Sequence, residues 1–261
     1  TLNILYPRHC PVCHRILLDQ NGLTCPECRN VFQPINRDYC LKCGKPVKPE
    51  EEYCPECRKH RRIFDQGRCG FAYTDRMRQS LLRYKYYGSR EYSAYYGIAL
   101  CRILGETVRQ WNPDVIIPIP LYPRKKRMRG FNQAEELAGE LGKNLHIPVA
   151  TDILVKVRET RSQKKLSAEE RKQNLQGAFH AKQPVKGLTI LLADDVYTTG
   201  STMETAALCL REAGAEKVYF VTLAAGDQVA VKVVNINCTV TIAAGSLSAD
   251  GTSVKIAGIG G

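Results

Sequence analysis

From residue 115 onward the apolar residues of this chain form short continuous runs, at 115–120, 190–193 and 218–224. Runs of this length are typical of strands that are buried on both faces of a parallel sheet. Between and beside them, apolar residues at helical spacing predict helices over 75–87, 92–110, 132–141 and 201–213. The alternation of the two patterns predicts an α/β fold, a parallel sheet flanked by helices.

Shorter apolar stretches at 71–73 and 153–155 predict two further strands. Beyond residue 226 the pattern changes to alternating apolar and small residues, which predicts β-strands and a hairpin turn at Asp250-Gly251. We therefore divide the chain into an N-terminal module over 1–62, an α/β body over 63–226 and a β-rich tail over 227–261. The sequence indicates no role for the tail.

The N-terminal module is poor in apolar residues and holds four C-x-x-C pairs. Eleven residues separate the first two pairs and ten the last two, so two pairs together supply the four thiolates of a tetrahedral Zn²⁺ site. The simplest assignment pairs them in order, as Cys10, Cys13, Cys25 and Cys28, then Cys40, Cys43, Cys54 and Cys57. Cross-braced pairing and an iron–sulfur cluster remain alternatives at this point. Because the zinc ligand shell is full, we expect two structural ions.

Composition narrows the function classes. The chain has 261 residues, 44% of them hydrophobic, which is enough for an ordinary globular core. Its net charge of +12 favours polyanionic partners such as nucleic acid or pyrophosphate. No run of about 18 apolar residues is present, and the N-terminus lacks a signal-peptide pattern. We therefore expect a cytoplasmic protein without a membrane span, in which the cysteines stay reduced.

The run at 190–193 ends in Asp194-Asp195, and a turn rich in Thr, Gly and Ser leads from there into the helix at 201–213. The backbone N–H groups of such a turn and the dipole of the following helix favour a bound phosphate. Adjacent carboxylates suit sugar hydroxyls, or a hydrated Mg²⁺ beside them. Together these features predict a site for a phosphorylated sugar.

Other polar residues and segments bear on this site. Five of the six residues from 124 to 129 are basic, in a loop after the strand at 115–120, where α/β sheets bind ligands; a general nucleic-acid patch is the alternative. Asn132 predicts a helix cap with Glu135 as its capping-box partner, and Ser201 with Glu204 predicts another. The polar stretch at 158–174 predicts a lid. Lys85 ends a helix, where it either reaches an anion or is solvated.

The segment from Leu191 to Thr202 resembles the type I phosphoribosyltransferases, whose motif for phosphoribosyl pyrophosphate (PRPP) it matches. More narrowly, the chain resembles the ComF family of competence-associated proteins, which includes GntX-like members. The features that carry this resemblance are the C-x-x-C pairs, Tyr84-Lys85-Tyr86, Pro118-Ile119-Pro120, Arg129-Gly130-Phe131-Asn132-Gln133-Ala134 and the segment 158–174. Covering about residues 8–225, the resemblance implies a type I phosphoribosyltransferase fold with a small N-terminal double zinc-ribbon module.

The resemblance also implies roles for single residues. Asp194 and Asp195 would bind the ribose hydroxyls and, with Mg²⁺, orient the sugar. The 5′-phosphate would be wrapped by Val196, Tyr197, Thr198, Thr199, Gly200, Ser201 and Thr202. The turn after Pro120 would face the pyrophosphate with Leu121, Arg124 and Arg129, and Lys85 would contribute a charge from the helix end.

Two hypotheses follow. The first is an Mg²⁺-dependent phosphoribosyltransferase whose acceptor the sequence does not reveal. The second is a non-catalytic competence protein that binds single-stranded DNA or the DNA-uptake machinery, with the PRPP fold as sensor or scaffold.

Overall fold

The computed structural model describes residues 7–17, 19, 22–158, 177–226, 240–243 and 246–249. The chain forms two compact units, Thr1–Asp227 and Gln228–Gly261. Two predictions fall outside the described residues: the lid at 158–174, apart from residue 158 itself, and the hairpin turn at Asp250-Gly251. None of the helices in the described ranges combines the length and the apolarity that crossing a membrane requires.

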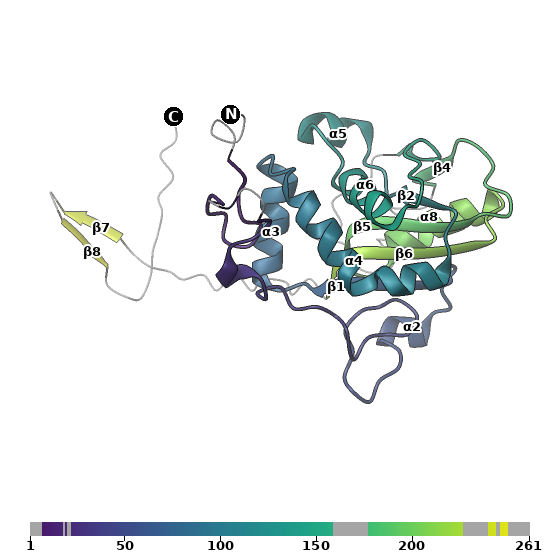
Figure 1. Cartoon of the computed structure of the whole chain (residues 1–261), viewed down its shortest axis with the longest axis horizontal. Coiled ribbons are helices and arrows are strands. Elements are labelled where there is room, and N and C mark those ends of the chain that lie inside the picture. Colours follow the sequence, from purple (N-terminus) through teal and green to yellow (C-terminus); the bar gives the residue numbers. More distant parts are fainter. Residues whose placement is uncertain are drawn as a thin grey trace. The chain divides into compact units, whose positions relative to one another are not determined.

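A four-stranded sheet forms the centre of the first unit (Figure 1). Its strands lie in the order β1-β6-β5-β2, and every neighbouring pair is parallel. Their bounds are Gln66–Ala72 for β1, Lys217–Ala225 for β6, Thr189–Tyr197 for β5 and Val115–Pro118 for β2. The predicted parallel sheet is therefore confirmed.

The alternation of side chains along β5 explains why its sequence reads as a continuous apolar run. Ile190 and Leu192 belong to the core on one face of the sheet, and Leu191 and Ala193 to the core on the other. All four are fully buried. A strand covered on both faces must be apolar at every position, not at every second one.

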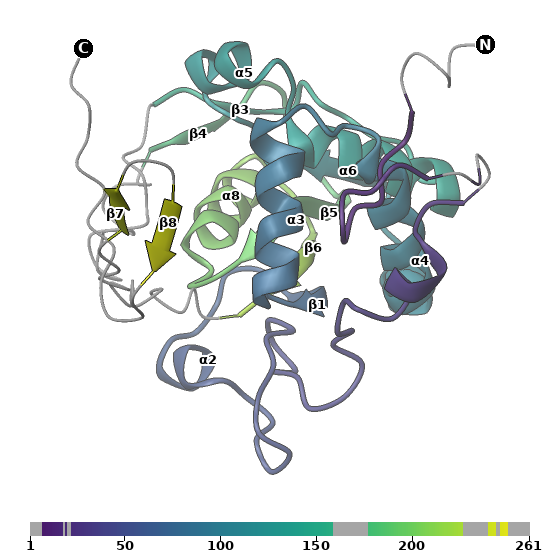
Figure 2. The same cartoon turned by 90° about the vertical axis from the view of Figure 1, so that its left-hand side faces the viewer.

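Helices cover both faces of the sheet, as the views in Figures 1 and 2 show. On one face α4 (Tyr92–Trp111) and α6 (Gln133–Leu145) pack side by side, with α3 (Asp75–Tyr86) in the same core. On the other face lies α8 (Ser201–Glu212). These four helices agree with the predicted ones.

Several smaller elements differ from the prediction. The stretch expected at 71–73 is the end of the longer β1, and β5 continues through the two acids to Tyr197. The basic residues expected in a loop form a short helix, α5 (Pro123–Arg129), because Pro123 is favoured in a first turn and Gly130 ends the helix with a left-handed φ of 82°.

Two short antiparallel pairs complete the described elements. The strands β3 (Leu154–Lys156) and β4 (Phe179–Ala181) pair with each other in the first unit. In the second unit β7 (Val240–Ala243) pairs with β8 (Ser246–Ala249), which agrees with the β-strands predicted for the tail.

The N-terminal module crosses the edge of the sheet. Ile35 N–H donates to the Gly70 carbonyl over 2.8 Å, and Ala72 N–H donates to the Gln33 carbonyl over 2.9 Å, so residues 33–35 extend the sheet beside β1. The first two C-x-x-C pairs precede this crossing and contain η1 (Pro26–Cys28); the last two follow it and contain α2 (Pro55–Lys59). The two groups of cysteines consequently pack into the cores on opposite faces of the sheet.

Candidate functional site

The eight cysteines form two four-sulfur groups. Within each group all the sulfur atoms lie within 4.8 Å of one another, and the groups are Cys10, Cys13, Cys25 and Cys28, and Cys40, Cys43, Cys54 and Cys57. The pairs therefore combine in sequence order, and cross-braced pairing is wrong.

The spacing of the sulfur atoms fits a single ion in each group. Four ligands at a Zn–S distance of about 2.3 Å in a tetrahedron lie about 3.8 Å apart. The sulfur atoms of Cys13 and Cys25 are 3.6 Å apart, and those of Cys43 and Cys54 are 3.7 Å apart. These residues would hold one structural Zn²⁺ in each ribbon.

The two acids at the end of β5 point to opposite faces of the sheet, because successive side chains in a strand alternate. Asp195 continues the face of Leu191 and Ala193, toward α3 and α6. There it is only 5% exposed, forms an ion pair with Lys85 and accepts a hydrogen bond of 3.0 Å from Gln133 Nε2. Asp194 lines a small pocket on the other side, toward α8.

The surroundings of the two carboxyl groups push their pKa values apart. Burial and the neighbouring Asp195 raise the pKa of Asp194 well above its ordinary value. Burial acts in the same sense on Asp195, but the ammonium group of Lys85 and the hydrogen bonds with Asp194 and Gln133 together outweigh it and lower the pKa of Asp195. Asp195 is thus a fixed, charge-compensated carboxylate, whereas Asp194 gains from a proton, a cation or a hydroxyl donor beside it.

The turn between β5 and α8 requires glycine at one position. Gly200 has a φ of 85° and is the N-cap residue of α8, without a side-chain cap. A Cβ atom there would overlap the hydroxyl of Tyr197. The first N–H groups of α8 have no acceptor one turn earlier within the helix. They border the pocket that is lined by Asp194, Val196, Tyr197, Thr198, Gly200, Ser201, Thr202 and Met203.

The predicted capping box of Ser201 and Glu204 is wrong. Ser201 is the first residue of α8 itself, and its Oγ lies 3.0 Å from Oγ1 of Thr199. Glu204 instead accepts a 2.7 Å hydrogen bond from the N–H of Ile63. The hydroxyl groups of the turn therefore remain at the pocket, and the Glu204 carboxylate turns toward the segment after the second ribbon.

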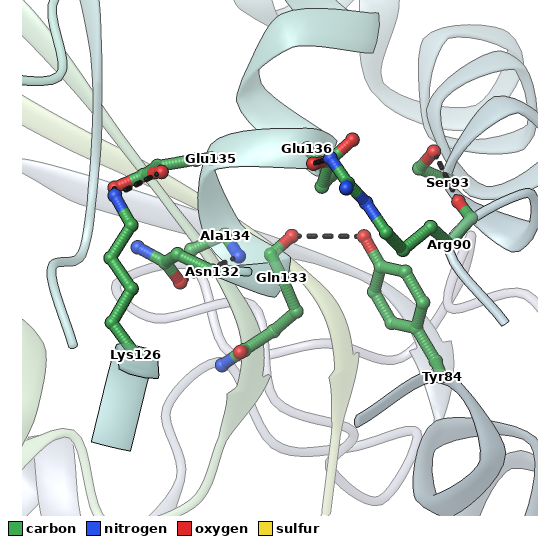
Figure 3. A network of polar contacts seen from close by, with 9 residues as sticks. All are labelled: Tyr84, Arg90, Ser93, Lys126, Asn132, Gln133, Ala134, Glu135 and Glu136. Carbon is green, nitrogen blue, oxygen red and sulfur yellow. Dashed lines mark hydrogen bonds and ion pairs between the residues drawn. The ribbon is translucent and has the colours of Figure 1, made fainter. Parts of the chain in front are cut away.

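The basic helix α5 and the helix α6 meet at Gln133. The guanidinium group of Arg129 donates to Gln133 Oε1, and Gln133 Nε2 donates to Asp195. The hydroxyl of Tyr84 donates to the Gln133 carbonyl over 3.0 Å, with the amide side chain pointing away from it (Figure 3). Gln133 thus connects a predicted pyrophosphate-facing residue, Arg129, with a predicted ribose-binding residue, Asp195.

The N-terminus of α6 is fixed to the end of β2. Asn132 Oδ1 accepts from the Ala134 N–H over 3.1 Å, as the predicted cap requires, and its Nδ2 donates to the Ile119 carbonyl over 3.0 Å. Glu135 does not complete a capping box: it pairs with Lys126 of α5 at 2.8 Å (Figure 3). The contacts hold α5 over the carboxyl end of β2, where Leu121 is half-buried and Arg124 is exposed.

Both the N-terminal module and the α/β body resemble known protein domains. A double zinc ribbon domain model matches residues 1–58, and a phosphoribosyl transferase domain model matches residues 94–244. Competence protein F of Haemophilus influenzae is 31% identical over 209 residues, covering 76% of this chain and 88% of that protein. For competence protein ComFC of Bacillus subtilis the values are 33% over 208 residues, 76% and 82%. DNA utilization protein YhgH of Salmonella typhimurium is 32% identical over 218 residues, covering 80% and 93%.

The chain belongs to the ComF family. The double zinc ribbon, the phosphoribosyltransferase fold and the resemblance found in the sequence are therefore confirmed.

Three charged or polar residues of this ComF-family site escaped sequence reasoning. Gln133 and Arg62 contact the predicted residues only through the folded arrangement. Lys156, at the end of β3, is half-buried; burial and the nearby Lys125 lower its pKa to about 8, against the opposing effect of Asp194. A shifted lysine beside a carboxylate is typical of functional sites. The one signal in the sequence was the position of Gln133 in the motif that carries the family resemblance.

Proposed function

We propose that this protein binds PRPP with Mg²⁺ through a phosphoribosyltransferase-type site and acts in natural competence or DNA uptake. The observation that carries the proposal is that the two acids have different surroundings. Asp195 is held by Lys85 and Gln133, whereas Asp194 lines the pocket formed by the turn and the N-terminus of α8. A ligand with a phosphate and neighbouring hydroxyls matches that pocket.

In this proposal the turn at 196–202 holds the 5′-phosphate with N–H and hydroxyl groups. Asp194 accepts from a ribose hydroxyl, and Asp195 keeps the end of β5 in place for it. Arg129 and Lys85 supply positive charge for the pyrophosphate, and Mg²⁺ bound with the pyrophosphate would add to it. Bond cleavage at C1 leaves an electron-poor sugar and a charged leaving group, so positioning and positive charge provide the catalysis.

Release of pyrophosphate from PRPP tests whether the protein turns over as a transferase. The protein, with its zinc content measured, is incubated with PRPP, Mg²⁺ and a panel of nucleobases and other nitrogen acceptors. Release that depends on one acceptor class and disappears in Asp194→Asn supports the transferase. Release equal in the wild type and in Asp194→Asn, or none with any acceptor, contradicts turnover.

A second candidate function is binding of single-stranded DNA, with the PRPP fold as sensor or scaffold. The net charge of +12 and the basic, largely exposed helix α5 favour it. Affinity that falls steeply with salt, and that is lost when Arg124, Lys125 and Arg127 are replaced by Gln, supports this function. Affinity that is unchanged in either case contradicts it.

We further propose that the protein works in the cytoplasm and that metal binding and PRPP binding belong to separate segments of the chain. The ribbons over 1–62 stay metal-loaded where thiols are reduced. The body over 63–226 carries the PRPP site, and we assign no role to the tail over 227–261.

A further inference from the structure

The second zinc ribbon contacts the phosphate-binding turn through one arginine. Arg62 follows the last ligand pair, and its side chain is only 9% exposed. Its guanidinium group donates to the Thr199 carbonyl over 3.3 Å and lies beside the sulfur of Cys57. A cysteine of the second four-sulfur group and the turn that lines the pocket therefore contact the same buried cation.

The same guanidinium group faces Glu204 in the first turn of α8. Arg62 Nη1 lies 3.7 Å from Glu204 Oε2, while the other carboxylate oxygen accepts from the Ile63 N–H. A carboxylate is favoured at a helix N-terminus, but it also competes there with any anionic ligand. Without Arg62, the negative charge of Glu204 would act against a phosphate at the start of α8.

A second contact reaches the turn from the same ribbon. The Tyr197 hydroxyl is buried without a hydrogen-bond partner, and Cys43 lies beside it. A thiolate held by a metal accepts hydrogen bonds from such neighbours, which in turn orient it. The Tyr197 ring stacks on Phe220 at 4.9 Å, so its position is fixed by the core.

The first ribbon provides a matched comparison. Arg15 also lies beside a ligand cysteine and a glutamate: its Nε donates to Cys13 over 3.4 Å, and its Nη2 pairs with Glu27 at 3.3 Å. That pair is exposed, at 65% and 70%, and both partners belong to the ribbon itself. The two arginines thus make similar contacts with a sulfur atom and a carboxylate. Arg62 also contacts the phosphate-binding turn, whereas both partners of Arg15 belong to its own ribbon.

We propose that Arg62 is a positioning residue that holds the phosphate-binding turn against the second zinc ribbon and neutralises Glu204 at the start of α8. This proposal has two halves. The positioning half concerns only how the turn is held. The neutralising half concerns the anion that binds at the turn, and it therefore rests on the proposed function. Through Arg62, the second ribbon thereby affects the turn that lines the pocket.

Amide hydrogen exchange tests the positioning half on the full-length, zinc-loaded protein. We expect Arg62→Met to speed exchange in the peptide covering 197–204 about tenfold, with two zinc ions per chain retained and the rest of β5 unchanged. Arg62→Lys restores part of the protection, and Arg15→Met leaves this peptide as in the wild type. Equal exchange in Arg62→Met and Arg15→Met overturns the proposal. If Arg62→Met fails to fold, Glu204→Gln replaces it in the test. This variant keeps an acceptor for the Ile63 N–H but removes the charge that Arg62 contacts. Wild-type exchange of the 197–204 peptide in Glu204→Gln also overturns the proposal.

Titration with PRPP and Mg²⁺ tests the neutralising half. Arg62→Met should weaken binding at least tenfold, and Arg62→Met/Glu204→Gln should recover the part of this loss that comes from the uncompensated charge of Glu204. No recovery in the double variant contradicts neutralisation. Absence of binding by the wild type contradicts the proposed function and with it the neutralising half, while the exchange measurement still decides the positioning half.

Discussion

Lys85, on α3, forms an ion pair with Asp195, on β5. The sequence left Lys85 as a residue that reaches an anion or is solvated, and the structure gives it a carboxylate of the protein itself. The pair lies where PRPP is proposed to bind, so the ammonium group already stands beside one of the two acids. Binding and stability should therefore both depend on this lysine.

We expect Lys85→Met to lower the free energy of unfolding by about 3 kcal/mol, because it leaves the Asp195 charge buried without its partner. Urea denaturation at neutral pH measures the loss. The control is Arg109→Gln, which breaks the exposed Glu106–Arg109 pair of α4. Such surface pairs contribute little, so the control should match the wild type. A Lys85→Met protein as stable as the control would contradict a stabilising ion pair.

Gln133→Met should weaken PRPP binding while preserving the fold. The substitution keeps the volume but removes the donor to Asp195 and the acceptor for Arg129. We expect about a tenfold rise in the dissociation constant, since one hydrogen bond to a charged group contributes about 1.5 kcal/mol. The control is Gln79→Met, on an exposed position of α3. Equal affinities of the two variants would show that Gln133 does not position the site.

The pH dependence of stability should differ between the wild type and Asp194→Asn. The pKa of Asp194 is raised in the folded protein. Its favourable contribution is therefore complete below the ordinary value of 3.8 and is lost as the pH rises through the folded-state pKa. Urea denaturation between pH 4 and pH 8 should show Asp194→Asn gaining stability relative to the wild type as the pH rises. A constant difference would mean that the pKa of Asp194 is not raised.

Metal analysis should find two zinc ions per chain. Cys10→Ser and Cys54→Ser should each reduce the content to about one and lower the midpoint of thermal unfolding, because the two cysteine groups lie in the cores on opposite faces of the sheet. The control is Cys101→Ser, since Cys101 is a half-buried cysteine outside both groups. Loss of both ions in either variant would contradict two independent sites.

The parts of the site that sequence reasoning predicted are local in the chain. Asp194, Asp195 and the turn after them lie in one strand–turn–helix unit, and each C-x-x-C pair closes on itself. Periodicity likewise predicted the sheet and its four principal helices, because strands covered on both faces and amphipathic helices leave clear patterns.

The remaining parts depend on contacts between distant segments. That Lys85 would meet Asp195, or Arg62 would meet Thr199, depends on how α3 and the second ribbon pack against the sheet. The wrong capping box at Ser201 has the same origin: its motif is correct locally, but Ile63 and Arg62 engage Glu204 from outside. The side chains alternate along β5, and this gives the two acids different surroundings. The predicted strand ends before the acids; a strand extended to Tyr197 would have predicted this difference.

Calorimetric titration of PRPP with Mg²⁺ is the most direct test of the central claim, that the end of β5 and the following turn form a PRPP site. The wild type, Asp194→Asn and Asp195→Asn are compared under the same conditions, with circular dichroism and zinc content confirming the fold of each. We predict binding by the wild type, and affinities at least tenfold lower for both variants. Equal binding by all three proteins, or none by the wild type, would contradict the claim.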